Sequence, residues 1–210
     1  MMTRRTRLAA FAVAVLATAG SAIGCRDTPT WVMETTPTWI IASYLAWSWK
    51  RFPWTDLVVA VLLLHALVLA IGGHYTYAEV PAGFWAKDVF DLSRNHYDRL
   101  GHFLQGVTPA LLVHEALVRT TPLRGGWWLA TLSIAAALAF SAIYELIEWL
   151  AATVLGQGAD AFLGSQGDVW DTQADMLCAL LGALFATVIL FPFQRAGMQR
   201  LISAEPTSGG

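Results

Sequence analysis

The chain has 210 residues, of which 56% are hydrophobic and only 13% are charged. Soluble globular domains carry about 25% charged residues, so this composition excludes an ordinary soluble domain. A formal net charge of −2 without a basic patch gives no reason to expect a nucleic-acid partner. The ten tryptophans are typical of helices that end at a bilayer surface. We therefore predict an all-α, polytopic transmembrane helix bundle that forms one domain over residues 1–210.

Six apolar segments follow one another along the chain and are predicted to span the bilayer. They cover residues 8–24, 37–49, 55–72, 100–118, 127–149 and 171–193. The second segment is short for a span, which needs about 20 residues. We expect it to borrow residues from Trp31 onward, and a re-entrant or interfacial helix is the alternative. Residues 73–99 are predicted to form a long loop, and residues 196–210 a disordered tail.

The first segment begins like a secretion signal, because three arginines precede its apolar run. Its end at residues 22–25 (Ala-Ile-Gly-Cys) faintly resembles a lipoprotein cleavage site. Since the rest of the chain also reads as membrane-embedded, we expect this helix to be retained, and cleavage is the alternative. The two cysteines lie far apart, in the first and last segments, which excludes a C-x-x-C motif.

The distribution of basic residues predicts the orientation. Six spans put both termini on one side of the membrane. Of the 13 lysines and arginines, only four fall on the other side: Arg26, Lys87, Arg94 and Arg99. Cytoplasmic loops carry the excess of such residues. We therefore expect both termini in the cytoplasm, a location in the bacterial inner (plasma) membrane, and the unusual polar residues on the outer face.

Three predicted helix ends on that face carry polar residues at helical spacing. The fourth span begins with Asp98, His102 and Gln105, the fifth ends with Ser141, Glu145 and Glu148, and the sixth begins with Asp168, Asp171 and Asp175. Residues three, four or seven positions apart share one face of a helix. Gly182 and Ala186 continue the sixth stripe and would let a neighbouring helix approach closely. We expect the three stripes to meet in one pocket beneath the outer surface.

Clustered carboxylates in a medium of low dielectric constant cannot all ionise unless positive charge accompanies them. Arginine, protonated histidine or a divalent metal could supply that charge, and mixed imidazole and carboxylate ligands favour zinc, manganese or iron over calcium. The candidate metal ligands are His96, His102, Glu148, Asp168 and Asp171. The candidate catalytic residues are Asp98, Arg99, Glu145 and Asp175. One of these carboxylates would act as general base, and Arg99 would bind an anionic head group.

The same residues also have structural interpretations. Asp168 or Asp171 could simply cap the sixth helix. The two glutamates could be interface residues at a helix end, and Asp98 with Arg99 could be a loop ion pair. His102 taken alone is more typical of an interhelical hydrogen bond than of a metal ligand. The joint occurrence of three polar stripes at one membrane depth favours a functional site.

Polar residues elsewhere in the spans have structural interpretations only. His65, in the middle of the third span, is expected to make a polar contact between helices. His114 and Glu115 lie toward the cytoplasmic end of the fourth span, and we expect them to snorkel or to pair with Arg119.

Four long motifs carry a resemblance to known proteins. They are residues 72–81 (GGHYTYAEVP), 94–102 (RNHYDRLGH), 144–149 (YELIEW) and 167–176 (GDVWDTQADM). With them the chain closely resembles the YjdF family of bacterial inner-membrane proteins over nearly its whole length. It resembles VanZ-like membrane proteins more distantly, through an acidic-basic-x-x-His helix start and an Asp that opens a glycine-containing last helix. The first resemblance implies location and topology but no chemistry, and the second hints at the cell envelope.

Three functions are compatible with these observations. The first is a metal-assisted hydrolase or transferase that acts on an envelope or lipid-linked substrate at the outer leaflet. The second is a structural or stress-related membrane protein whose polar cluster only fastens three helices together. The third is a cation-coupled carrier, which is less favoured because its ion site would be expected near the midplane. The predicted partner is the lipid bilayer, and no oligomeric state is predicted.

Overall fold

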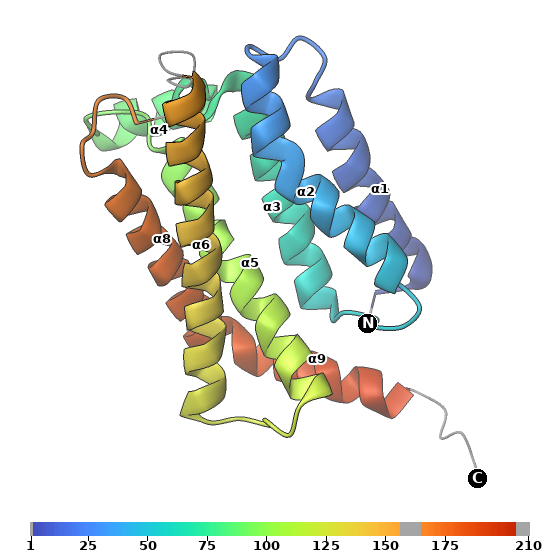
Figure 1. Ribbon diagram of the computed structural model, residues 1–210. Coiled ribbons are helices and arrows are strands. Elements are labelled where there is room, and N and C mark those ends of the chain that lie inside the picture. The colour runs from blue at the N-terminus through green and yellow to red at the C-terminus, as the bar shows by residue number, and fades with distance from the viewer. Residues whose placement is uncertain (1, 156–164, 205–210) are drawn as a thin grey trace.

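The structure, a computed structural model, describes residues 2–155 and 165–204, and every regular element in these ranges is helical (Figure 1). The elements in chain order are α1 (Arg4–Gly20), α2 (Thr28–Ser48), α3 (Asp56–Tyr75), the 3₁₀ turn η1 (Tyr77–Glu79), α4 (Pro81–Phe90), α5 (Tyr97–Thr120), α6 (Trp127–Leu155), α8 (Asp171–Phe185), the π-helical turn η3 (Ala186–Leu190) and α9 (Phe191–Ala204).

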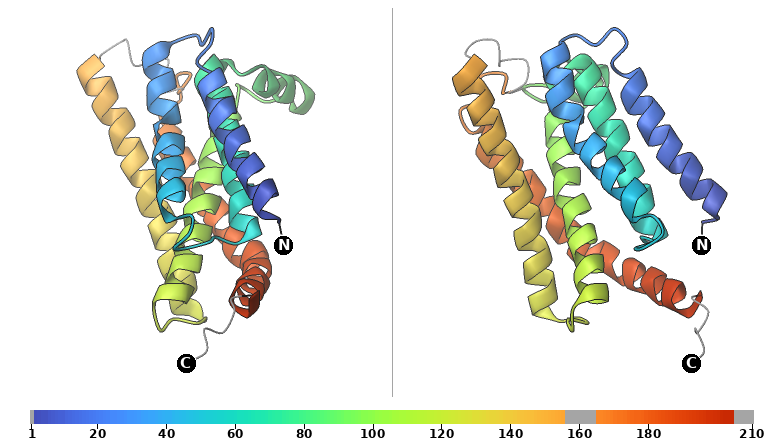
Figure 2. Two further views of the ribbon diagram at one scale, coloured as in Figure 1. Left: turned by 90° about the vertical axis from the view of Figure 1, so that its right-hand side faces the viewer. Right: turned by 45° about the vertical axis from the view of Figure 1, so that its right-hand side comes forward.

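The long helices form two groups that lie side by side. Helices α1, α2 and α3 make one group, and α5, α6 and α8 make the other, with α5 also packing on α3 (Figures 1 and 2). Within the described residues, α3, most of α6 and the continuous helix 171–201 are long and apolar enough to cross a membrane. The all-helical class is therefore confirmed, whereas six spans remain a prediction.

Both ends of the described chain lie at one end of the bundle, which we call the terminal end (Figure 1). The opposite end, which we call the acidic end, carries the start of α5, the start of α8 and the last turns of α6. After η3 the last helix turns aside, and α9 lies across the terminal end of α3 and α5 (Figure 2).

Helix α2 is longer than its apolar core, as expected. It begins at Thr28, where Asp27 caps it by accepting a hydrogen bond from the Thr30 amide at 2.8 Å, and Pro29 occupies the first turn. These residues are an ordinary helix-start signal. The helix runs through Pro37 to Ser48 and is 21 residues long, which is enough to span a bilayer.

Several predicted boundaries were wrong. Residues 73–99 are not one loop, because they hold η1 and α4 as well as the last turn of α3. Pro81 lies in the first turn of α4, a position where proline favours the start of a helix. The predicted disordered tail from residue 196 is helical as far as Ala204, and residues 205–210 lie outside the described residues.

Helices α5 and α8 cross with their backbones in contact. A Cβ atom built on Gly106 of α5 would lie 1.9 Å from the carbonyl oxygen of Ala179, and one built on Gly182 of α8 would lie 2.0 Å from that of Phe103. The close approach expected at Gly182 is therefore confirmed, and Gly106 is its counterpart on the other helix. Only glycine permits this spacing.

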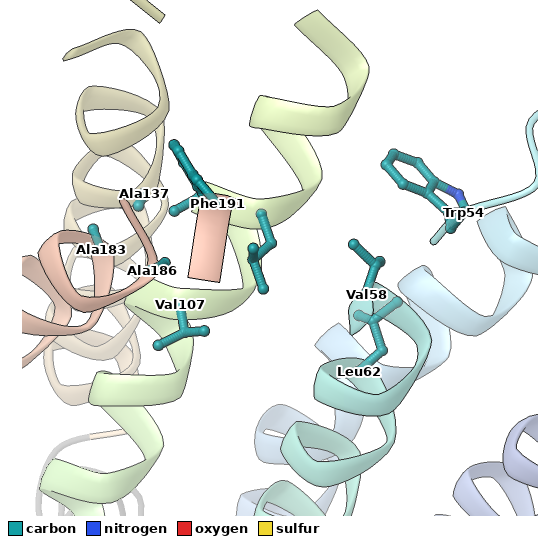
Figure 3. Packing of buried hydrophobic residues seen from close by; sticks show 10 residues of the cluster. Trp54, Val58, Leu62, Val107, Ala137, Ala183, Ala186 and Phe191 are labelled. Atoms are coloured by element: carbon teal, nitrogen blue, oxygen red, sulfur yellow. The ribbon is translucent and has the colours of Figure 1, made fainter. Parts of the chain in front are cut away.

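The apolar core joins the two groups of helices. Its buried members are Trp54, Val58, Leu62, Val107, Ala110, Leu111, Ala137, Ala183, Ala186 and Phe191 (Figure 3). Its alanines lie on α5, α6, α8 and η3, and its larger side chains come from α3, α5, Trp54 just before α3 and Phe191 of α9. The small residues let the helices lie close enough for short polar side chains at the acidic end to meet.

A largely buried polar network connects the helices at the terminal end. The Glu115 carboxylate accepts hydrogen bonds from the Thr55 hydroxyl at 2.7 Å and from Gln194 at 3.1 Å, and it pairs with Arg119 at 3.0 Å. Gln194 also bonds His114 at 2.6 Å. The predicted pairing with Arg119 is confirmed, but neither His114 nor Glu115 snorkels, because both have no exposed surface.

We predict that Gly106→Ala separates α5 from α8 and lowers the stability of the protein. The added methyl group meets backbone and not a movable side chain, so we expect a cost of about 1–3 kcal/mol, visible as a lower thermal midpoint in detergent. Gly20→Ala is the control, since a Cβ there meets no atom within 4 Å. Equal midpoints for the two variants would contradict the crossing.

Candidate functional site

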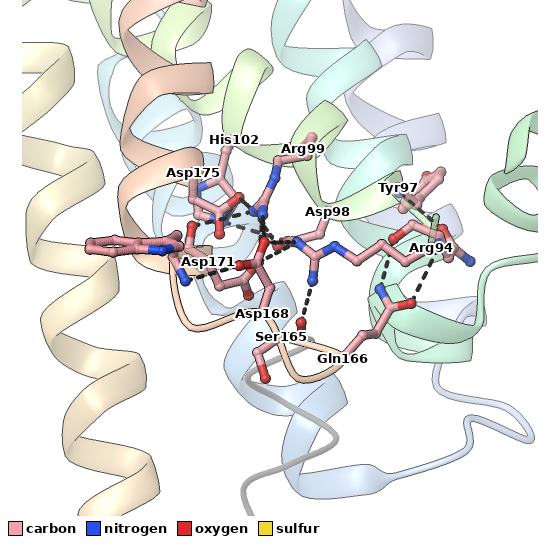
Figure 4. Close-up of polar contacts among 12 residues, drawn as sticks. Arg94, Tyr97, Asp98, Arg99, His102, Ser165, Gln166, Asp168, Asp171 and Asp175 are labelled. Atoms are coloured by element: carbon pink, nitrogen blue, oxygen red, sulfur yellow. Dashed lines mark hydrogen bonds and ion pairs between the residues drawn. The ribbon is translucent and has the colours of Figure 1, made fainter. Parts of the chain in front are cut away.

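The polar residues of α5 and α8 converge at the acidic end (Figure 4), and Glu145 of α6 joins them. The His102 ring lies among three carboxylates: its Nε2 atom is 3.5 Å from Asp98 and 3.7 Å from Asp175, and its Nδ1 atom is 3.6 Å from Glu145. The side chains of these four residues are at most 16% exposed. The expectation that acids from remote segments share one pocket is therefore confirmed.

The placement of these four residues follows from the helices that carry them. Asp98 and His102 lie one turn apart at the start of α5, and Asp175 lies one turn inside α8. The glycine crossing between α5 and α8 brings Asp175 opposite His102. Glu145 comes from the last turns of α6 and faces the other side of the ring.

Two arginines neutralise the aspartates at the start of α8. Arg99 pairs with Asp171 at 2.6 Å and with Asp175, and Arg94 also pairs with Asp171 (Figure 4). Asp168 lies farther out, 3.5 Å from Arg94 and 3.6 Å from Arg99. It precedes the helix, which begins at Asp171, so the prediction that Asp168 belongs to a helical stripe was wrong. Asp168 reaches the cluster through the arginines instead.

The role expected for Arg99 changes with this geometry. Its guanidinium donates to Asp171 and Asp175, and a carboxylate oxygen of Asp98 lies 3.8 Å away. A guanidinium engaged in this way has little capacity left for an anionic head group. Arg99 is therefore placed to hold Asp175 in position beside His102.

The turn before α8 is docked against the segment before α5. The amide of Asn95 donates to the Gln166 side chain at 3.2 Å, and that side chain donates back to the Asn95 carbonyl at 2.7 Å. The Asn95 side chain donates to the carbonyl of Val80 and accepts from the amide of Tyr97 (Figure 4). These bonds join α4, the start of α5 and the start of α8 into one unit that positions both arginines.

A second set of polar residues, from α2, η1 and α6, lies behind His102. Glu34 is buried and accepts a hydrogen bond from the Tyr144 hydroxyl at 2.9 Å. Tyr77 is also buried, and its burial, together with the nearby Glu34 carboxylate, raises the pKa of Tyr77 well above its usual range. These three residues line a small cavity of about 50 Å³ with His102 and Asp98.

Glu34 and Tyr77 are site residues that the sequence patterns did not identify. Glu34 lies in the expected extension of the second span from Trp31 onward, but it was assigned no role, and Tyr77 lies in the predicted loop. An acid inside a membrane helix is itself a signal of a polar site, and Glu34 carried that signal. His65 lines the same cavity and bonds the Thr108 hydroxyl at 2.9 Å, which confirms its predicted role as a polar contact between helices.

Several polar atoms around His102 make no hydrogen bond among the described residues. Both carboxylate oxygens of Glu145, the Nδ1 atom of His102, the Oε1 atom of Gln105 and the hydroxyl of Ser141 are buried without a hydrogen bond. More than 90% of buried polar groups in proteins are paired, so each exception calls for an explanation. A cation or a polar ligand at this point would satisfy these atoms.

The residues closest to His102 have the arrangement of a metal-binding group. One ligand atom from each of Asp98, His102 and Asp175 can be chosen so that all three lie within 4.8 Å of one another. Imidazole nitrogen with carboxylate oxygen suits zinc, manganese or iron. Ligands on facing helices are the usual way to build such a site in a helix bundle.

The structure groups the predicted ligands differently from the sequence. Of the five predicted metal ligands, only His102 belongs to this group of three, and it is joined by two residues predicted to be catalytic. Asp168 and Asp171 face the arginines. Glu148 is buried one turn beyond Glu145 and is not in the group. His96 makes no hydrogen bond within the described part of the chain. Partial burial, together with the nearby Arg94 and Arg99, lowers the pKa of His96.

We predict that Arg99→Gln destabilises the protein strongly. Removing one partner of a buried ion pair leaves the other charge uncompensated, at a cost of about 3–5 kcal/mol. The double variant Arg99→Gln, Asp175→Asn should recover part of that loss in a thermal melt. Arg26→Gln is the control, because Arg26 and Glu79 form an exposed pair worth about 0–1 kcal/mol. Equal effects of the two single variants would contradict the network.

Comparison with known proteins agrees with the motifs and the helices. Residues 6–196 match the model of a family described as predicted membrane protein (DUF2238). The chain is 51% identical over 178 residues to the inner membrane protein YjdF of Escherichia coli (strain K12), which covers 85% of each chain. No solved structure matches it. The resemblance to the YjdF proteins and the inner-membrane location are therefore confirmed, and the chain belongs to the DUF2238 family of membrane proteins.

Proposed function

We propose that this membrane protein is a metal-dependent hydrolase or transferase that acts on an envelope or lipid-linked substrate at the outer face of the inner membrane. The observation that carries the proposal is the group around His102. Asp98, His102 and Asp175 offer three ligand atoms within 4.8 Å of one another, and Glu145 lies 3.6 Å from the same ring without a hydrogen bond.

The charge balance of the cluster supports a bound cation. Two arginines face four aspartates: Asp98, Asp168, Asp171 and Asp175. Glu145 adds another carboxylate beside His102. Carboxylates at such short distances in a medium of low dielectric constant favour further positive charge, and a divalent ion beside His102 would bring two charges next to Glu145, which pairs with no arginine among the described residues.

Each residue of the cluster would then have a separate role in the reaction. A divalent cation, when bound, supplies Lewis-acid catalysis and a more acidic water. Asp98, His102 and Asp175 would hold it, and Arg99 would fix the orientation of Asp175 through its ion pair. Glu145 has both carboxylate oxygens free of hydrogen bonds, so it would act as the general base that accepts a proton from the attacking water or hydroxyl.

The predicted topology puts this chemistry on the periplasmic side. The acidic end lies opposite the terminal end in the bundle (Figure 1). With both termini in the cytoplasm, as the distribution of basic residues favours, the site would open toward the outer leaflet. Lipid-linked or envelope substrates are the molecules that a site at this depth would meet.

A structural role is the second candidate, and one observation favours it. Arg94 and Arg99 already cross-link the start of α5 to the start of α8, and Tyr144 of α6 bonds Glu34 of α2. These contacts would fasten helices even without a metal. A carrier gains no comparable support, because the buried, apolar Leu111 separates the polar residues of α5 at the two ends.

The metal content of the purified protein tests the proposal. After incubation with zinc, manganese or iron(II) and removal of loose metal, we expect about one equivalent in the natural protein, since three protein ligands suffice for a site. His102→Gln and Asp175→Asn should lose it. Glu145→Gln should keep it, because Glu145 is outside the group of three ligands. Glu79→Gln, on an exposed acid, is the control.

Two outcomes would count against the enzyme. Retention of less than about a tenth of an equivalent of any of these metals by the natural protein would remove the metal from the mechanism. If Asp175→Asn then lowered the thermal midpoint while no metal was present, the cluster would serve to fasten the helices.

A further inference from the structure

An apolar cavity lies away from the acidic cluster, between α1, α2 and α3. It has a volume of about 310 Å³, at the lower end of the range of ligand pockets, about 300–1,000 Å³. Its walls are almost entirely apolar, and they include four alanines that leave room between the helices: Ala10, Ala14, Ala42 and Ala66. The cavity does not depend on the function proposed above.

The cavity extends along α2 and α3. On α3 its lining runs from Val59 to Leu69, eleven residues that rise about 15 Å in a helix. On α2 it runs from Pro37 to Trp49. This length is about half the hydrocarbon thickness of a bilayer, about 30 Å. The dimensions therefore suit one hydrocarbon chain of the leaflet at the terminal end.

The mouth of the cavity carries positive charge. Arg4 lines the mouth at the terminal end, is exposed, and makes no ion pair among the described residues. Lys50 follows α2 at the same end and is also exposed. The acid that opens α3, Asp56, is already engaged by Arg7 at 2.5 Å and by the Met2 amide at 2.7 Å. A head group there would meet unneutralised basic side chains.

We propose that this cavity binds one acyl chain of an anionic phospholipid from the leaflet at the terminal end, with the phosphate of the lipid beside Arg4. Charge complementarity selects the head group, because a basic mouth at a membrane surface attracts anionic lipids. The apolar walls select the chain, and Trp49, which lines the cavity near its mouth, is typical of the bilayer interface.

The inner tip of the bound chain would reach the floor of the small polar cavity. Pro37, His65 and Leu69 line both cavities. A methyl terminus at this point would pack against the side chains that separate the lipid from Asp98 and His102. The lipid would thereby exclude water from the terminal side of the polar cavity.

Native mass spectrometry of the full chain in detergent tests this site. With phosphatidylglycerol added, we expect one retained lipid, bound about fivefold more tightly than phosphatidylethanolamine, the preference that one basic residue at the surface confers. Ala14→Trp fills the cavity and should abolish the retained lipid. Ala12→Trp is the matched control on the same helix, because Ala12 is exposed and does not line the cavity.

Arg4→Gln provides a second test that does not depend on a filled cavity. Arg4 is exposed, so its replacement should leave the fold and the metal content unchanged while the preference for phosphatidylglycerol disappears. The proposal is overturned if the natural protein retains no lipid, if Ala14→Trp folds and retains as much lipid as Ala12→Trp, or if Arg4→Gln keeps the preference. Since metal binding is measured separately, failure here leaves the function proposed for the acidic cluster to its own test.

Discussion

The arrangement of the acidic end depends on compensation of charge in a place with little water. The start of α8 and the turn before it carry three aspartates, and acids at this depth of a membrane protein are costly without positive charge nearby. Arg94 and Arg99 supply it through pairs with Asp171 and Asp175. Both arginines precede or begin α5, so the charge pairing also fixes which helix α8 meets.

Arg99 reaches Asp175 and lies 3.8 Å from Asp98, whereas Glu145, on the other side of His102, pairs with no arginine among the described residues. The outer part of the cluster consists of the ion pairs that Arg94 and Arg99 make with Asp171 and Asp175. Inside lies an imidazole between three carboxylates, with the Glu145 oxygens unpaired and Glu34 and two tyrosines behind it. Structural ion pairs rarely leave buried acceptors unsatisfied. The two parts therefore differ in that the acids of the outer part are paired with arginine, whereas the inner part holds buried acceptors without a hydrogen bond.

Much of this could be predicted from the sequence, because local spacing determines which residues share a helix face. Asp98 with His102 and Glu145 with Glu148 are spaced so that a helix must present each pair together, and the convergence of their helices followed from topology. What could not be predicted depended on crossings between helices. Nothing local to Gly106 says that it faces Ala179, and nothing local to Glu34 says that Tyr144 lies beside it.

Helix boundaries were a different kind of failure. The predicted helices followed the apolar runs, so they did not include α4 or the first three residues of α2, although Pro81, Asp27 and Pro29 are ordinary start signals. The predicted start of the last helix was misplaced in a similar way, because Asp168 was assigned to its helical stripe. In each of these places the deciding residues are polar and lie just outside the apolar run, where capping and not hydrophobicity sets the start of the helix.

The glycine crossing also limits how this molecule can move. The backbones of α5 and α8 touch at Gly106 and Gly182, so we expect these two helices to move together. His102 and Asp175 would then keep a fixed distance from each other. Helix α6 contains no glycine, and it presents the small, fully buried side chains of Ser133, Ala137 and Ser141. The position of Glu145 beside His102 therefore rests on side-chain packing, whereas that of Asp175 rests on touching backbones.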